Sequence, residues 1–201
     1  MSGSILSLLA VVLLFAPFVF YVVMKQFFGM KEGIIGSFIA TAIACLVIYV
    51  LFDGLEQKVL VAVVLIFVLG TISLKTDEDY YFKLEPALKS AFTSLFLLWF
   101  VLIGDPVTKD VLSTMAESEI AMSSEAQRMA IQGFVQDPKN QSIFWFFELW
   151  LIFLGLAYGI FMMFVARKWS DVPWLIAKLL YFPLVFIPAF LFTMIMMIVR
   201  T

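Results

Sequence analysis

A chain of 201 residues that is 64% hydrophobic and only 14% charged is too apolar for an ordinary soluble domain. Such a domain carries about 45–50% apolar and about 25% charged residues. The net charge of −2 and the scattered lysines and arginines argue against a nucleic-acid partner. The chain has no histidine, which removes the usual general base and the commonest metal ligand. Its single cysteine, Cys45, cannot form a disulfide within the chain.

Six apolar runs predict an all-α fold, a polytopic membrane helix bundle in which residues 1–201 form a single membrane domain. The expected spans are residues 5–24, 34–52, 59–74, 87–103, 143–165 and 173–199. A hydrocarbon core about 30 Å thick requires about 20 helical residues, which most of these runs approach or exceed. The first run is longer than the core of a signal peptide and follows no basic side chain, so we expect it to remain as a span.

Prolines predict irregular backbone in the first and last spans. Pro17 removes a helical hydrogen bond in the second half of the first span, so a kink or a break is expected there. Pro183 and Pro188 lie inside the last run, which is longer than a straight crossing requires. We therefore expect the last span to be kinked, tilted or broken.

Small residues at helical spacing predict close contacts between helices. Gly155 and Gly159 form a Gly-x-x-x-Gly pattern in the fifth span, which fits packing within the chain and homo-oligomerisation equally well. Two stripes of small residues run along the second span, namely Gly36, Ala40 and Ala44, and Ser37, Thr41 and Cys45. Packing explains these two stripes better than a polar pathway does, because none of their side chains is expected to be charged at neutral pH.

A charged stretch over residues 76–86, TDEDYYFKLEP, separates the first three spans from the last three. We interpret it as a solvated loop at the membrane interface, ordered against neighbouring loops, with a partner-docking or headgroup-contacting patch as the sharper alternative. Its three consecutive acidic residues could hold a hard cation, although their spacing defines no ligand set. A small excess of lysine and arginine favours a cytoplasmic position for this stretch and an external position for both termini.

Residues 107–141 form the only extended polar region, and two short amphipathic helices are expected in it. The first starts from an N-cap at Thr108, and the second runs from a capping box at residues 124–127 to about Asp137. Their methionine-rich faces could contact a partner or cover the ends of the spans. The apolar positions are Val111, Met115 and Met122 in the first helix and Met129, Ala130, Phe134 and Val135 in the second.

Two charged side chains, Glu148 and Lys178, lie inside apolar runs, where an ionisable residue is a candidate functional site. We expect Lys178 to extend toward the nearer interface. Glu148 is shorter and has aromatic neighbours, so we expect it to turn toward the bundle and contact a donor from residues 107–141 or from a partner. Because the fifth and sixth spans run antiparallel, the depths of the two side chains are measured from opposite faces of the membrane, and a direct pair is not expected unless a span is broken.

Several short motifs resemble the bacterial septation protein A family. Ala16-Pro17 before an aromatic-rich run is similar to the family's opening Leu-Pro segment, and Ala40-Thr41-Ala42 to its second-span Ala-Thr-Ala. Residues 70–74, GTISL, an acidic stretch and then residues 81–86, YFKLEP, resemble the family's Phe-Ile-Lys-x-Lys-Pro-Thr block. Trp174-x-x-x-Lys178 is similar to its late Trp-x-x-x-Lys. The chain departs from the family pattern at Glu85, where the family has lysine, and at Ala87, where it has threonine.

The resemblance implies a cell-envelope protein of the bacterial inner membrane, linked to septation and cell division and to partner membrane proteins, with no established chemistry. The expected function is therefore non-enzymatic, exerted through protein partners in septation or envelope maintenance; the alternative is a transporter or lipid-handling protein. No catalytic, cofactor or metal site is expected, because no acid, base or metal-binding groups converge in the sequence. Lipid and other membrane proteins are the expected partners. The candidate partner or structural residues are Asp79, Lys83, Glu85, Pro86, Glu148, Gly155, Gly159, Trp174 and Lys178.

Overall fold

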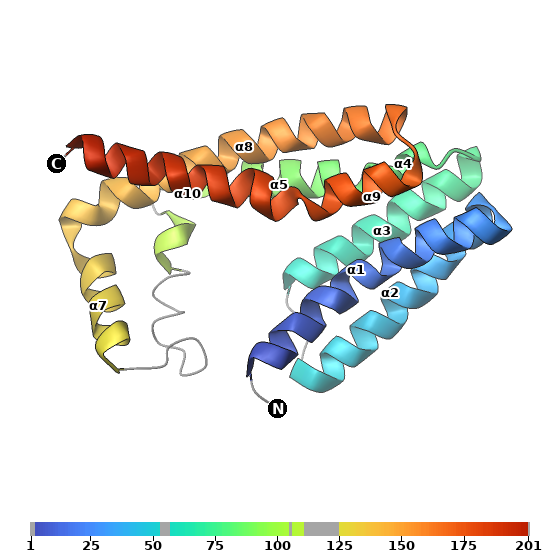
Figure 1. The fold of residues 1–201 in the computed structure, drawn as a ribbon, viewed down its shortest axis with the longest axis horizontal. Coiled ribbons are helices and arrows are strands. Elements are labelled where there is room, and N and C mark those ends of the chain that lie inside the picture. The colour runs from blue at the N-terminus through green and yellow to red at the C-terminus, as the bar shows by residue number, and fades with distance from the viewer. Residues whose placement is uncertain (1–2, 53–56, 105, 111–124, 201) are drawn as a thin grey trace. The chain divides into compact units, whose positions relative to one another are not determined.

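The computed structural model describes residues 3–52, 57–104, 106–110 and 125–200, and every element in these ranges is helical (Figure 1). This confirms the predicted all-α fold. Residues 107–110 are helical, and a short 3-10 helix, η1 (Pro138–Asn140), precedes α8. The helices are α1 (Gly3–Phe28), α2 (Met30–Phe52), α3 (Gln57–Thr76), α4 (Tyr80–Lys83), α5 (Glu85–Ile103), α7 (Glu125–Gln136), α8 (Gln141–Lys168), α9 (Asp171–Leu179) and α10 (Tyr181–Arg200).

Four helical segments are long and apolar enough to cross a membrane: Met30–Val50, Tyr80–Ile103, Gln141–Lys168 and Asp171–Met196. Two shorter apolar stretches, Phe15–Phe28 in α1 and Ala62–Thr76 in α3, lie at the predicted first and third spans. Each of the six predicted spans is thus matched by an apolar helical segment. The chain has the helices of a polytopic membrane protein.

The outward faces of these helices are apolar. On α8, the side chains of Phe153, Ile160 and Phe164 are each more than half exposed. Water penalises exposed hydrocarbon by about 25 cal/mol per Å², whereas lipid does not, so these faces suit contact with acyl chains.

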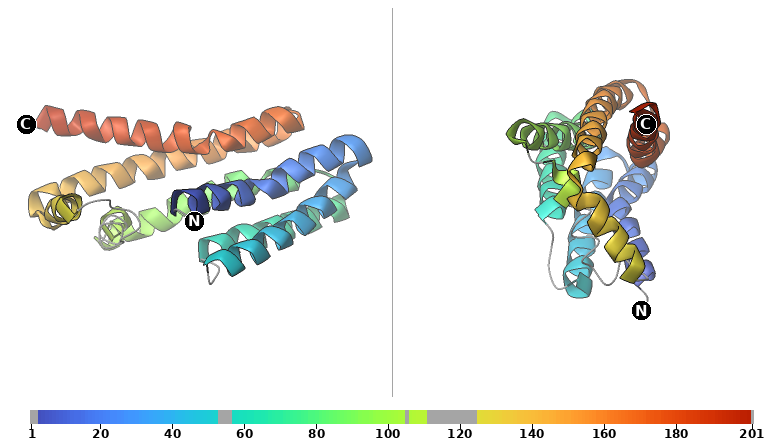
Figure 2. Two further views of the ribbon diagram at one scale, coloured as in Figure 1. Left: turned by 60° about the horizontal axis from the view of Figure 1, so that its bottom comes forward. Right: turned by 90° about the vertical axis from the view of Figure 1, so that its left-hand side faces the viewer.

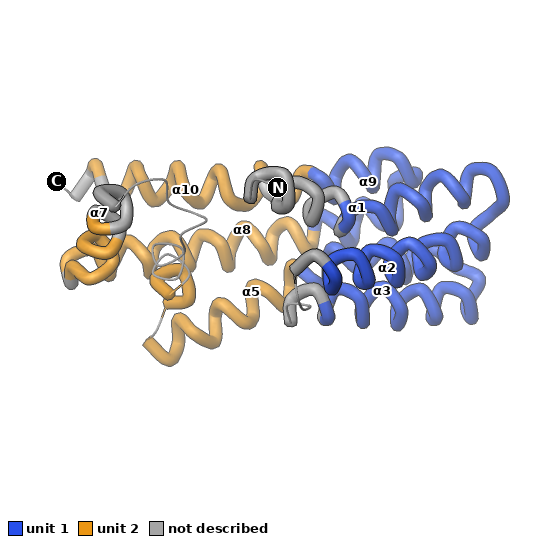
Figure 3. Tube along the Cα trace, turned by 90° about the horizontal axis from the view of Figure 1, so that it is seen from below, with its two compact units in different colours: residues 1–89, 161–179 blue, residues 90–160, 180–201 orange. Residues whose placement is uncertain are grey.

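Contacts within the chain divide it into two compact units (Figure 3). Unit 1 comprises Met1–Lys89 and Phe161–Leu179, and unit 2 comprises Ser90–Ile160 and Leu180–Thr201. Helices α5 and α8 each contribute residues to both units, and the last span divides at its break. The single membrane domain expected from the sequence remains a prediction.

In unit 1, helices α1, α2 and α3 lie side by side (Figure 1, Figure 2). A Cβ added at Gly33 in α2 would stand 2.9 Å from the carbonyl oxygen of Tyr21 in α1. A Cβ added at Gly70 in α3 would overlap the ring of Phe38 in α2. The two small-residue stripes of α2 are buried except for the half-buried Cys45, which confirms their predicted role in packing.

In unit 2, α8 packs against both α5 and α10. The hydroxyl of Ser90 in α5 donates a hydrogen bond to the carbonyl of Gly155 in α8 at 2.7 Å. The ring of Trp150 in α8 stacks on Phe192 in α10, with centroids 4.3 Å apart. Gly155 therefore lies at a helix–helix contact, as predicted, and Gly159 is buried one turn further along.

Helix α7 has the predicted start and stop and covers the beginning of α8. Its Val135 is buried, and the ring of Phe134 meets Phe144 of α8 edge to face at 5.7 Å. Met129, however, is exposed, so this amphipathic face is only partly covered within unit 2. The apolar residues expected on the first amphipathic helix, Val111, Met115 and Met122, lie outside the described residues, as does the capping residue Ser124.

The prolines act differently in the two irregular spans. Helix α1 continues through Pro17 without a break, so the break considered for this span is absent. The last span is interrupted at Leu180, between α9 and α10, so of the three expected outcomes (kinked, tilted or broken) the structure shows a break. Pro183 lies in the first turn of α10, where a helix does not need the missing N–H, while Pro188 lies inside that helix.

We predict that Gly155→Leu lowers the thermal stability of the chain. The hydroxyl of Ser94 in α5 already occupies the space that a Cβ at Gly155 would need. A larger side chain must therefore push α5 and α8 apart, and overpacking of this kind destabilises by about 1–3 kcal/mol. The measurement is thermal unfolding of the purified chain in detergent, followed by tryptophan fluorescence.

The matched control is Gly133→Leu. Gly133 is also helical, in α7, but a Cβ there would meet no atom within 4 Å. Equal melting temperatures for the two variants would contradict the predicted contact.

Candidate functional site

The stretch over residues 76–86 is mostly helical, which corrects its interpretation as a solvated loop. Helix α3 continues to Thr76, and a turn follows in which Asp77 adopts a positive φ of 58°. The single turn of α4 then comes before α5, which starts at Glu85. Phe82, Lys83, Glu85 and Pro86 are buried, because the turn folds the stretch back onto the helices of unit 1.

Four charged side chains meet at this turn, and we call them the charged cluster: Lys25, Asp79, Lys83 and Asp171. The ammonium of Lys83 lies 2.9 Å from Asp79 and 2.7 Å from Asp171. Lys25 pairs with both of the same carboxylates, at 2.9 Å from Asp171. The cluster joins α1, the turn, α4 and α9, and its two positive and two negative charges sum to zero.

Ion pairing determines the ionisation of Asp79. Burial alone would raise the pKa of its carboxyl group. Hydrogen bonds from Lys25 and Lys83, together with their charges, outweigh burial and hold that pKa below its usual value. The hydroxyl of Tyr21 donates a further hydrogen bond to Asp79 at 3.2 Å. These contacts confirm that the stretch over residues 76–86 is ordered against neighbouring segments.

A second ion pair lies deeper in unit 1, between Glu85 in α5 and Lys178 in α9, at 2.5 Å. Glu85 is 1% exposed and Lys178 9%. The expectation that Lys178 extends to the interface is therefore wrong. Glu85 supplies the countercharge, and the ring of Phe18 lies against the ammonium, so the side chain is accommodated where it is.

Aromatic side chains connect the buried pair to the charged cluster. The indole N–H of Trp174, which is fully buried, donates a hydrogen bond to the carbonyl of Lys83 at 3.0 Å. The rings of Tyr21 and Phe82 lie 4.5 Å apart beside it. The backbone N–H of Phe82 donates to the hydroxyl of Ser73 at 2.8 Å, which attaches α4 to α3.

Five of the predicted site residues therefore come together in unit 1, and Pro86 is buried next to them. They are Asp79, Lys83, Glu85, Trp174 and Lys178. Sequence reasoning missed Lys25, Asp171 and the aromatic residues Phe18 and Tyr21. The orientation prediction carried a signal for the charged ones, because it places Lys25, Asp79 and Asp171 at loops on the same side of the membrane.

Glu148 lies in unit 2 and is fully buried. Its carboxylate accepts a hydrogen bond from the backbone N–H of Val107 at 3.1 Å. This confirms the prediction that Glu148 turns inward and contacts a donor from residues 107–141. A backbone donor of this kind ties the start of α8 to the segment after α5.

The acidic run does not form a cation site among the residues that the structure describes. Asp77 pairs with Lys31 at 3.5 Å, and Asp79 turns into the charged cluster. Across the same described ranges, no three His, Cys, Asp or Glu side chains converge in a way that would hold a metal ion.

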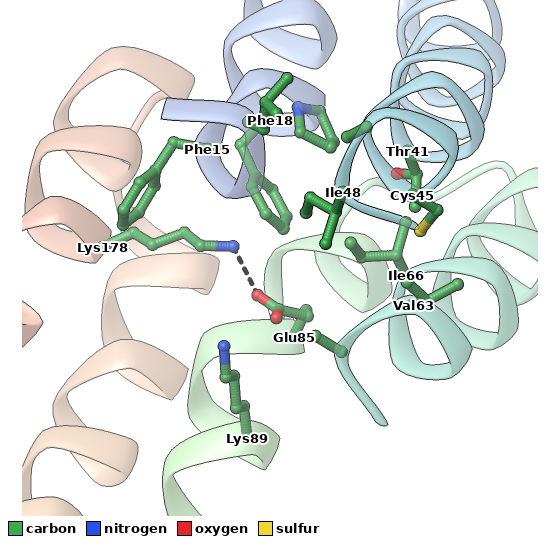
Figure 4. A pocket seen from close by; sticks show the side chains of 14 residues that line it. Phe15, Phe18, Thr41, Cys45, Ile48, Val63, Ile66, Glu85, Lys89 and Lys178 are labelled. Atoms are coloured by element: carbon green, nitrogen blue, oxygen red, sulfur yellow. Dashed lines mark hydrogen bonds and ion pairs between the residues drawn. The ribbon is translucent and has the colours of Figure 1, made fainter. Parts of the chain in front are cut away.

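A cavity of about 110 Å³ lies beside the buried pair within unit 1. Figure 4 shows Lys178 and Glu85 joined at one end of it and Lys89 just below the carboxylate. The opposite wall comes from α1, α2 and α3 and is mostly apolar, with Ile48 and Ile66 among its side chains. Thr41 and Cys45 of α2 also line it.

Comparison with protein-family models, with curated proteins and with solved structures gives no match to this chain.

We predict that Glu85→Leu is strongly destabilising, because it leaves the buried Lys178 without this carboxylate. Removing one partner of a buried ion pair typically lowers the free energy of unfolding by about 3–5 kcal/mol. The double variant Glu85→Leu/Lys178→Met should recover most of the loss, since both buried charges are then absent. Thermal unfolding of the single and double variants measures the difference.

The control for this cycle is Lys31→Gln, which breaks the exposed pair with Asp77. Exposed pairs contribute about 0–1 kcal/mol, so this variant should resemble the parent chain. A double variant that is less stable than Glu85→Leu alone would contradict the prediction.

We also predict that acid weakens the fold through Asp79. The pKa of Asp79 is lower in the folded chain than in the unfolded chain, so its ion pairs stabilise the fold above the unfolded value. That stability is lost as the pH falls below about 4, the usual carboxyl range, and through the lower folded value. Unfolding measured from pH 6 to pH 2 should show a smaller pH dependence in Asp79→Asn than in the parent chain. Parallel curves for the two proteins would refute a contribution from Asp79.

Proposed function

We propose that this chain is a non-enzymatic protein of the bacterial inner membrane that acts through protein partners in septation or envelope maintenance. The observation that carries the proposal is the meeting of two motifs that resemble the septation protein A family. Residues 81–86 and the Trp174-x-x-x-Lys178 motif are far apart in sequence. They are joined by the hydrogen bond from Trp174 to the carbonyl of Lys83. The Lys178–Glu85 pair lies beside this contact but is particular to this chain, because the family has lysine where Glu85 stands. Two sequence motifs that characterise one family are expected to lie close together in the fold when they stabilise the same part of the structure.

The chemistry of this network supports a role without catalysis. Its charged side chains bind one another, and Lys83 and Glu85 are buried. An enzyme site instead directs acid, base or nucleophilic groups at a space for a substrate. The charged cluster and the buried pair act on the helices themselves and fix the ends of α1, α4, α5 and α9.

The outer side of the turn supports partner binding. Glu78 is exposed, Tyr81 is half-exposed, and the guanidinium of Arg167 lies over the ring of Tyr80 at 5.2 Å. Exposed aromatic and charged groups on a rigid base suit recognition of another protein, because little conformational freedom is lost on binding. We propose that this surface faces the cytoplasm and receives the partner.

The proposed function is tested by photocrosslinking in bacterial cells. We expect p-benzoylphenylalanine at Glu78 or Tyr81 to give discrete protein adducts. The same probe at Ile160, a side chain on the apolar face of α8, should give none. Deletion of the chain should lengthen the cells or weaken the envelope. Trp174→Ala should fail to restore normal cell length and envelope integrity, while Trp169→Ala, which alters an exposed indole, should restore them.

Absence of adducts at all positions, together with normal division in the deletion strain, would refute this role. Adducts at Ile160 equal to those at Glu78 and Tyr81 would refute the proposed surface.

A further inference from the structure

The cavity in unit 1 separates polar from apolar groups. Three charged side chains lie at one end: Glu85 and Lys89 from α5 and Lys178 from α9 (Figure 4). The other end is mostly hydrocarbon from α1, α2 and α3, with Thr41 and Cys45 of α2 also in the lining (Figure 4). Its side chains include Leu13, Ala44, Ile48, Ala62 and Ile66. A molecule that satisfies both ends must itself be amphiphilic.

The charged end has a positive excess. One carboxylate and two ammonium groups line it, and Glu85 is already bound to Lys178 at 2.5 Å. Lys89 forms no ion pair with any residue that the structure describes. Lys89 therefore offers the cavity an ammonium that can form a charge-assisted hydrogen bond with an anion.

The volume restricts what can bind. The cavity has a volume of about 110 Å³. Pockets that enclose a whole drug-sized ligand measure about 300–1,000 Å³. The cavity therefore suits an anionic oxygen group with the first few methylenes of a chain, while the rest of the ligand remains outside.

The surroundings supply such a ligand. Lys89 lies one helical turn into α5, in a segment apolar enough to span the membrane. Its side chain is exposed, so the cavity is accessible from outside unit 1 at this residue. Acidic phospholipids and fatty acids carry a net negative charge on oxygen atoms attached to hydrocarbon, which matches the two ends of the cavity. In phosphatidylethanolamine the ammonium of the headgroup offsets the charge of the phosphate.

We propose that the cavity binds the anionic oxygen group of a membrane amphiphile beside Lys89, with the adjoining methylenes against Ile48 and Ile66. The phosphate of an acidic phospholipid and the carboxylate of a fatty acid share this chemistry. Binding does not depend on a role in septation, and photocrosslinking at Glu78 and Tyr81 would be unaffected by its failure.

The test is native mass spectrometry of the full chain, delipidated in detergent and titrated with phosphatidylglycerol, phosphatidylethanolamine or palmitate. We expect phosphatidylglycerol, palmitate or both to bind more tightly than zwitterionic phosphatidylethanolamine. Lys89→Gln should weaken that binding about tenfold, the effect of losing one charge-assisted hydrogen bond. The control Lys75→Gln removes an exposed lysine that does not line the cavity and should leave the affinity unchanged.

A second variant, Ala44→Leu, fills the apolar end and leaves all three charges in place. This variant should also weaken lipid binding. If Lys89→Gln does not fold, the affinity of Ala44→Leu tests whether the cavity is the lipid site. Binding of phosphatidylglycerol alone identifies the phosphate as the ligand, and binding of palmitate alone identifies the carboxylate.

Three results would each overturn the lipid site. The first is equal affinity for the anionic and zwitterionic lipids. The second is unchanged affinity in both Lys89→Gln and Ala44→Leu. The third is that inorganic phosphate, which has no acyl chain, raises the melting temperature as much as the anionic lipid does. Loss of all lipid on delipidation with no rebinding would show that the cavity holds only water.

Discussion

The buried ion pair between Glu85 and Lys178 is the contact on which the arrangement of unit 1 depends. Moving either charge out of water costs several kcal/mol, so each is tolerable only beside the other. The pair therefore fixes the position of α9 along its axis relative to the first turn of α5. A shift of α9 by one turn, about 5.4 Å, would remove the ammonium from the carboxylate.

This constraint matters because packing in lipid lacks the main force that assembles soluble proteins. Acyl chains are as apolar as leucine, so apolar burial does little to select one helix arrangement over another. Polar contacts and close backbone approaches supply the selection instead. In unit 1 these are the charged cluster, the buried pair and the contact between Gly33 and α1. In unit 2 they are the Ser90–Gly155 hydrogen bond and the contact between Glu148 and Val107.

Local patterns predicted the helices well, because hydrophobicity, capping residues and proline act within a few residues of one another. The apolar runs, the end of α7 before Asp137 and an irregularity in the last span were evident in this way. Glu148 was also predictable, because a short carboxylate among aromatic side chains must find a nearby donor. Gly155 followed from the same kind of local reasoning, since a Gly-x-x-x-Gly pattern implies a close neighbour.

The ion pairs were not predictable, because their partners lie far apart in the sequence. Lys178 was expected to extend to the interface because no countercharge stands near it in the sequence. Its partner Glu85 lies 93 residues earlier. The stretch over residues 76–86 was misread for a related reason. Taken by themselves, its charged residues suggest that the stretch is exposed to solvent. In the charged cluster, however, Asp79 and Lys83 form ion pairs with Lys25 and Asp171, which come from two other helices. Charge in a sequence thus indicates exposure only where no distant partner exists.

The contacts of the last span differ on the two sides of Leu180. Helix α9 is fixed in unit 1 by the hydrogen bond of Trp174 and the ion pair of Lys178. Helix α10 is fixed in unit 2 by ring contacts, including Tyr181 against Tyr158 at 4.9 Å. Pro183 follows Leu180 at no cost in hydrogen bonding, because the first turn of a helix has no use for its N–H. Proline is therefore compatible with a new helix that starts at Tyr181, whereas in the middle of an uninterrupted helix it would remove a hydrogen bond.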